Sequence, residues 1–180
     1  MDIKVTSAKK GEKPIMANLL NFYLHDFSEF GDDEIEAEGR FTYPMLEQYW
    51  EDPNRYPFLI RASGVLAGFA LVRILNDPRA SNTIIDMTEF FVLRRFRRHG
   101  VGTTAACRLW DLFVGQWEVR VMVTNLNALP FWQKTINSYT RGSYSEEQGG
   151  TRAGKWHTFQ FVSGADVELP DDIEGNILDY

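Results

Sequence analysis

The sequence feature that most constrains the fold is a hydrophobic segment that runs directly into a turn rich in arginine and glycine. Residues 84–93 are rich in β-branched and aromatic side chains, which is typical of a strand. The turn Arg97-Arg98-His99-Gly100-Val101-Gly102 follows, and residues 100–116 have apolar side chains at helical spacing. The sequence therefore predicts a strand, a tight turn and a helix in immediate succession.

The turn has the properties of an anion-binding site. Gly100 and Gly102 lack a Cβ atom, so a ligand can approach the backbone closely. The unpaired N–H groups and the dipole at the start of a helix favour a negative charge there. Four arginines add positive charge to an otherwise acidic chain: Arg94, Arg95, Arg97 and Arg98. These features predict a site for a diphosphate, and the alternative is a tight turn with solvated arginines.

Two common nucleotide sites do not fit this turn. No Gly-Lys-Ser/Thr follows the glycines, as a phosphate-binding loop of nucleotide triphosphatases requires. No parallel strand carrying a ribose-binding acid follows about twenty residues later, as a dinucleotide site requires. A nucleotide-binding protein is therefore the least favoured alternative.

The remaining elements follow from periodicity and from turn residues. Helices are expected from Pro14 to before Gly31, from Pro44 to Tyr49, over residues 100–116 and over residues 128–136. Strands are expected at residues 58–62, 65–75, 84–93 and 119–123, with a closing hairpin formed by residues 139–144 and 156–162. Residues 148–151 supply its turn. No internal repeat or interdomain linker interrupts this order.

Composition narrows the class of protein. The 180 residues suit one domain, expected over residues 1–163 with an acidic tail at 164–180. With 25 acidic and 19 basic residues the net charge is −6, which argues against binding to nucleic acid. Cys107 is the single cysteine, so no internal disulfide forms. No membrane-length apolar run and no signal peptide is present, and a cytoplasmic location is expected.

Two segments resemble one enzyme family. Residues 92–102, Val-Leu-Arg-Arg-Phe-Arg-Arg-His-Gly-Val-Gly, are similar to the Arg/Gln-x-x-Gly-x-Gly/Ala signature of the GNAT superfamily of N-acetyltransferases. Residues 125–132, Asn-Leu-Asn-Ala-Leu-Pro-Phe-Trp, resemble that superfamily's Asn-x-x-Ala-x-x-Phe-Tyr segment. One helix and one strand separate the two, as in the superfamily, and the resemblance extends from about residue 58 to residue 161.

The resemblance implies a fold and a co-substrate. The expected fold is α/β (α+β), with a central mixed, mostly antiparallel sheet splayed in the middle and flanked by about four helices. Acetyl-CoA would lie in the opening of the sheet, and no metal is implied. The residues implied in its binding are Phe90, Phe91 and Val92 through their backbone, Arg97, Arg98, His99, Gly100, Val101, Gly102 and Thr103 at the diphosphate, and Asn125, Ala128 and Phe131 on the far side.

A carboxylate on the central strand is the candidate general base. Transfer to an amine requires removal of a proton from the attacking nitrogen. Glu89 stands among Met87, Phe90 and Phe91, where partial burial would raise its pKa. Asp86 is the second candidate, and strict strand alternation places it on the opposite face, so only one of the two should face the substrate.

Trp132 departs from the family pattern. The superfamily usually has a tyrosine there, which acts as the acid toward the departing thiolate, whereas indole cannot act as an acid. Tyr139 and Tyr144 are weaker candidates for that role, and packing of each ring in the interior is the alternative.

The acceptor is expected to contact the first helix and the segment after it. In the superfamily this region forms the acceptor pocket, which points to Tyr23, Asp26, Glu29 and Phe30 as binding residues. An acidic, aromatic wall would suit a cationic amine of a small molecule or peptide, and a solvated acidic loop is the alternative. The three histidines are too dispersed to hold a metal. A non-catalytic acyl-CoA-binding module is the competing function, and a homodimer is compatible with the fold.

Overall fold

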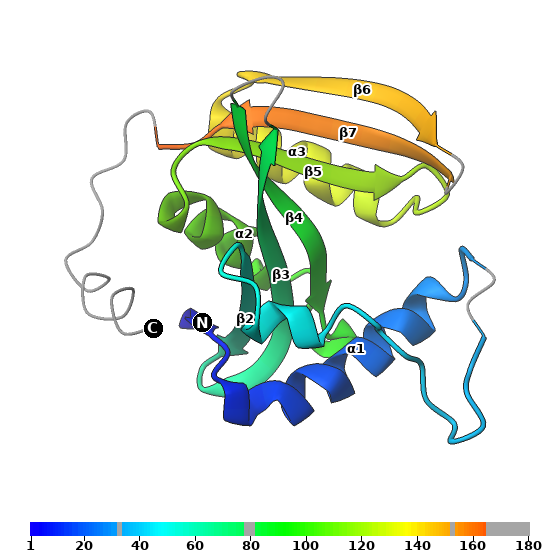
Figure 1. The fold of residues 1–180 in the computed structure, drawn as a ribbon. Coiled ribbons are helices and arrows are strands. Elements are labelled where there is room, and N and C mark those ends of the chain that lie inside the picture. Colours follow the sequence, from blue (N-terminus) through cyan, green and yellow to red (C-terminus); the bar gives the residue numbers. More distant parts are fainter. Residues whose placement is uncertain (32–33, 78–81, 152–153, 165–180) are drawn as a thin grey trace.

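The described residues form one seven-stranded sheet with helices on both faces (Figure 1). The computed structural model describes residues 1–31, 34–77, 82–151 and 154–164. The strands lie in the order β1-β2-β3-β4-β5-β7-β6. In chain order the elements are β1 (Ile3–Ser7), η1 (Lys10–Glu12), α1 (Lys13–Phe27), η2 (Glu47–Trp50), β2 (Arg55–Ala62), β3 (Val65–Asp77), β4 (Asn82–Val92), η3 (Arg94–Phe96), α2 (Val101–Leu112), β5 (Gln116–Met122), α3 (Ala128–Thr140), β6 (Tyr144–Thr151) and β7 (Gly154–Val162).

The sheet divides at its centre. Its neighbouring strands pair antiparallel except β4 and β5, which run parallel. This parallel ladder covers only Ile84–Met87 against Gln116–Val119. Beyond it, β4 continues along β3 to Val92, whereas β5 continues along β7 to Met122. The expected mixed, mostly antiparallel sheet that opens in the middle is thereby confirmed.

Apolar helix faces cover the two sides of the sheet. Helices α2 and α3 bury Leu109, Trp110 and Ile136 against one face. Helix α1 and the short η2 bury Met16 and Tyr49 against the other face, together with side chains of β2, β3 and β4. Burial of this apolar surface is the main source of stability of the fold. It also holds the C-terminal part of α1 beside the opening between β4 and β5.

Several element bounds differ from those expected. The described residues form three α-helices rather than about four, because the segment after Pro44 is a turn followed by the 3-10 helix η2. Helix α2 ends at Leu112, since Gly115 has a φ of 147° and leads into β5. Helix α3 extends to Thr140, so β6 begins only at Tyr144 and includes residues 148–151, which were expected to turn.

Residues 165–180, which contain nearly all of the expected acidic tail, lie outside the described residues. None of the described helices combines the length and the apolar character that a membrane span requires.

Candidate active site

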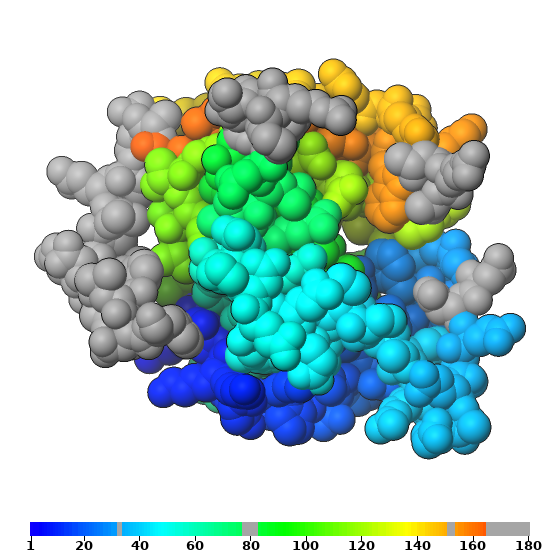
Figure 2. All heavy atoms as spheres, viewed as in Figure 1, coloured from blue at the N-terminus to red at the C-terminus, as the bar shows by residue number. Residues whose placement is uncertain are grey.

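A cavity of about 310 Å³ lies where β4 and β5 part. Figure 2 shows blue α1 facing the yellow-green and orange segments of β5 and β7 across this part of the surface. Its walls come from α1, β4, β5, β7 and the start of α3. The lining residues are Tyr23, Leu24, Phe27, Met87, Thr88, Glu89, Phe90, Val119, Arg120, Val121, Met122, Asn125, Ala128, Trp132 and Trp156.

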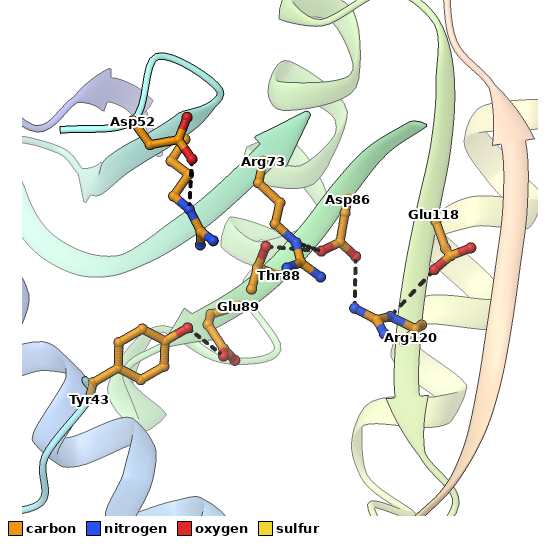
Figure 3. A network of polar contacts seen from close by, with 9 residues as sticks. Tyr43, Asp52, Arg73, Asp86, Thr88, Glu89, Glu118 and Arg120 are labelled. Carbon is orange, nitrogen blue, oxygen red and sulfur yellow. Dashed lines mark hydrogen bonds and ion pairs between the residues drawn. The ribbon is translucent and has the colours of Figure 1, made fainter. Parts of the chain in front are cut away.

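Glu89 is the one acidic residue among the described residues that line this cavity. Its two carboxylate oxygens accept hydrogen bonds from two phenols, those of Tyr23 and Tyr43. The bond from Tyr43 is 3.0 Å long (Figure 3). Burial raises the pKa of Glu89, and the nearby charge of Asp86 raises it further, whereas the two phenols oppose the shift. The net pKa lies above the ordinary value of glutamate, which favours a role in proton transfer.

A bulge in β4 brings Asp86 and Glu89 to the same face of the sheet. Asp86 pairs with Arg73 and Glu89 pairs with Leu71, and the register shifts by one residue at Thr88. Because residues 71 and 73 of β3 point to the same face, so do their partners. The expectation that strict alternation separates the two carboxylates was wrong, since it took no account of the extra residue.

Asp86 nevertheless differs from Glu89 in its surroundings. Its side chain is fully buried and accepts bonds from Arg73 Nε at 2.6 Å, Thr88 Oγ1 at 3.0 Å and Arg120 Nη2 at 3.3 Å (Figure 3). It is absent from the lining of the cavity. Its oxygens are thus already engaged by two guanidinium groups and a hydroxyl group, whereas Glu89 lines the cavity. Of the two strand carboxylates, only Glu89 therefore lies on the wall of the cavity.

The backbone beside the cavity offers unpaired groups to a ligand. On the side where β5 leaves it, β4 pairs with no other described strand from Thr88 to Val92. The start of α2 has no side-chain cap, so the N–H groups of its first turn stay available. Gly100 has a φ of +79°, a left-handed conformation that suits glycine. Its Cα faces open space, whereas the missing Cβ of Gly102 makes room for the Phe131 ring.

The arginines of the turn have separate partners. Arg94 and Arg97 each donate to a different oxygen of Asp26, at 2.6 and 2.7 Å. The Nε of Arg97 also donates to the Val92 carbonyl at 2.7 Å. The two guanidinium groups lower the pKa of the Asp26 carboxyl, whereas its partial burial opposes that shift. Arg98, with a φ of 62°, and His99 are exposed at the tip of the turn.

The pairing of Asp26 changes its interpretation. Both of its oxygens are engaged, and it is absent from the lining of the cavity. We therefore interpret Asp26 as a link between α1 and the arginine turn rather than as a contact for the acceptor. Four arginines were expected to face a diphosphate. Two of them, Arg94 and Arg97, form ion pairs with Asp26 instead.

The second motif forms the far wall of the cavity. The Oδ1 of Asn125 accepts a hydrogen bond at 3.0 Å from the backbone N–H of Ala128, the first residue of α3. Phe131 stacks on Phe90 of β4 with ring centroids 6.1 Å apart, and Trp132 meets the same ring edge-on at 5.1 Å. Aromatic contacts thus connect β4 to α3 at the place where β4 and β5 separate.

The structure places the expected acceptor residues in different surroundings. Tyr23 lines the cavity and bonds to Glu89, whereas Glu29 is exposed and Phe30 packs on the Phe27 ring at 5.9 Å. Phe27, not Phe30, lines the cavity. Three residues near Glu89 or on the cavity wall were not predicted from the sequence: Tyr43, Arg120 and Trp156. Strand alternation predicts that Arg120 points opposite to the apolar Val119 and Val121, but it does not mark Arg120 as a cavity residue, because both valines line the cavity as well.

The two weaker candidates for the acid lie elsewhere. Tyr139 donates to Asp111 at 2.7 Å, and the Tyr144 ring lies 6.1 Å from that of Phe159. Neither residue lines the cavity.

Burial raises the pKa of Cys107 to about 11, so its thiol stays protonated. Within the described part of the chain, no group of three His, Cys, Asp or Glu side chains is arranged to hold a metal ion.

A mixed sheet that opens between two parallel strands, with a helix start beside the opening, defines an acetyltransferase-like fold. The chain belongs to the acetyltransferase (GNAT) family, whose model matches residues 17–137. The resemblance carried by the two sequence motifs is thereby confirmed. No curated protein sequence matches the chain.

Solved structures of acetyltransferases share this fold. An acetyltransferase from Thermus thermophilus has a TM-score of 0.62 and 16% identity, over 90% of this chain and 97% of that one. An aminoglycoside acetyltransferase from an uncultured soil metagenomic sample has a TM-score of 0.60 and 15% identity, over 83% and 93%. The ribosomal-protein-S18-alanine N-acetyltransferase from Escherichia coli has a TM-score of 0.57 and 13% identity, over 94% and 99%.

Proposed function

We propose that the protein is an N-acetyltransferase that moves an acetyl group from acetyl-CoA directly to an amine in a ternary complex. The observation that carries the proposal is the cavity in the fork of β4 and β5, with the half-buried Glu89 on its wall. The acceptor is an amine of a small molecule or a peptide. A cytoplasmic location and a homodimer remain part of the proposal, the former supported only by the sequence.

The residues around the fork of β4 and β5 fit two parts of acetyl-CoA, the pantetheine arm and the diphosphate. The backbone edge of β4 from Thr88 to Phe91 can pair with the two amides of the pantetheine arm, as a strand would, whereas the Val92 carbonyl is already bonded to Arg97. The N–H groups at the start of α2, together with the exposed Arg98, suit the diphosphate. Acetyl-CoA supplies an acetyl group activated as a thioester.

Glu89 carries the first proton transfer in this proposal. Its carboxylate accepts a proton from the amine, and the freed lone pair attacks the thioester carbon. The carbon–sulfur bond then breaks, and the sulfur needs a proton. Tyr23 is the one tyrosine among the described lining residues. It gives its hydroxyl proton to the sulfur and recovers one from Glu89, so the first proton lost by the ammonium form of the acceptor ends on the thiol. The second proton leaves the nitrogen for solvent as the amide forms.

Tyr23→Phe tests this path. Loss of a positioned acid is expected to lower kcat by about a hundredfold. Tyr43→Phe is the matched control, because Tyr43 also donates to Glu89 but lies outside the lining of the cavity. Steady-state rates of both variants decide the matter. Equal losses would mean that Tyr23 acts only as a hydrogen-bond donor to Glu89.

Binding of CoA is tested by thermal unfolding. A ligand that binds only the native state at a hundred times its Kd adds about 2.7 kcal/mol, which raises Tm by roughly 5–11 °C in a chain of this size. We expect that rise with CoA and none with ATP or NAD. A rise with ATP or NAD alone would favour a nucleotide-binding protein.

A non-catalytic acyl-CoA-binding module is the second candidate, because Trp132 replaces the tyrosine usual in the family. Release of CoA thiol in the presence of a panel of amines separates the two. Stabilisation by CoA without amine-dependent thiol release would favour the module.

A further inference from the structure

The cavity has an unusual balance of charge for the acceptor. Among the described residues that line it, Glu89 and Arg120 are the only charged ones. The rest of the lining is apolar or aromatic, apart from Thr88 and Asn125. One wall thus offers a carboxylate, and the β5 wall offers a guanidinium group.

Arg120 is loosely held by its neighbours. Its Nη2 lies 3.3 Å from Asp86 and its Nε 3.4 Å from Glu118, and its side chain is 42% exposed. Asp86 has a closer partner in Arg73 at 2.6 Å. A guanidinium group has five N–H donors in a planar fork that matches a carboxylate. Arg120 therefore retains donors for an anion in the cavity.

Glu89 is the complementary partner for a cation. The structure gives it no ion pair with a described residue, and its two hydrogen bonds come from neutral phenols. Asp86 and Glu118 balance the charges of Arg73 and Arg120, so Glu89 leaves the cluster with an excess negative charge. An ammonium group beside Glu89 would neutralise it.

We propose that the acceptor is a free amino acid with an apolar or aromatic side chain. This inference rests on the proposed acetyl transfer. Its amine lies at Glu89, its carboxylate at Arg120, and its side chain against the aromatic lining that includes Phe27 and Trp156. A polyamine would meet repulsion from Arg120 and no second lining acid, and a peptide amine lacks the adjacent carboxylate.

The test compares three acceptors that differ only in the group beside the amine: L-phenylalanine, phenylalaninamide and phenethylamine. The wild type is expected to prefer phenylalanine by at least tenfold in kcat/KM over both analogues, because a charge-assisted pair is lost in each. In Arg120→Gln this preference should fall toward one, chiefly through KM. Arg108→Gln, an exposed arginine on α2, is the matched control and should keep the preference.

Calorimetric titration of CoA-saturated protein gives a readout independent of turnover. Phenylalanine should bind the wild type and Arg108→Gln at least tenfold more tightly than it binds Arg120→Gln. Equal use of acid, amide and amine, or a preference for spermidine, would overturn the inference and leave acetyl transfer intact. If no amine were acetylated, the proposed function would fail, and the titration alone would still support or overturn the amino-acid site.

Discussion

Glu89→Gln is expected to lower kcat/KM for acetyl transfer by about 10³-fold, within the range that general bases contribute. The glutamine has nearly the same shape, so it can still fill the space between Tyr23 and Tyr43. It cannot take up a proton from the amine. Steady-state kinetics with the best acceptor of the panel measures the effect, and the Tm rise caused by CoA should be unchanged.

The pH dependence follows from the raised pKa of Glu89. Because the ionised form is the base, kcat/KM should fall as pH decreases through a value above the ordinary 4.5 of glutamate. A raised pKa in the folded state also means that ionising Glu89 costs stability. The wild type should therefore lose stability relative to Glu89→Gln as pH rises through that pKa, and the difference should vanish below the unfolded value. A Gln variant with wild-type turnover would eliminate Glu89 as the base.

The parts of the site that depend on local sequence could be predicted. The turn around Gly100 and the start of α3 near residue 128 lie within short segments, whose residues form their structure from near neighbours. The same holds for Glu89 on its apolar strand. The opening of the sheet was anticipated only through the resemblance, because pairing between β4 and β5 depends on contacts distant in sequence.

The parts of the site that depend on strand register or on irregular backbone could not be predicted from the sequence. A bulge adds one residue without any change in strand composition, so Asp86 was assigned to the wrong face. Tyr43 donates to Glu89 from a segment without helix or strand periodicity, so the sequence gives no indication that the two residues meet. Asp26 was predicted as an acceptor contact because its charge was visible, whereas its arginine partners lie about seventy residues later.

Asp86→Ala is expected to reduce the free energy of unfolding by about 3–5 kcal/mol, the usual cost of breaking a buried ion pair. The carboxylate is fully buried, and its removal leaves Arg73, Arg120 and Thr88 without their shared acceptor. For a chain of this length that loss lowers Tm by roughly 6–20 °C. Calorimetry or denaturant unfolding measures it. Asp86→Asn keeps the shape of the side chain and serves where the alanine variant does not fold.

The matched control is Asp2→Ala, which removes an exposed carboxylate 4.0 Å from Lys4. Exposed pairs contribute about 1 kcal/mol or less, so Tm should hardly change. A comparison of Glu89→Gln with Asp86→Asn distinguishes a catalytic role from a structural role for the two carboxylates of β4. Glu89→Gln should remove turnover and preserve the fold, whereas Asp86→Asn should weaken the fold and retain the pH profile of the remaining activity. Loss of turnover in Asp86→Asn with an unchanged Tm would instead make Asp86 the base, because a carboxylate that only holds Arg73 and Arg120 cannot be removed without cost to stability.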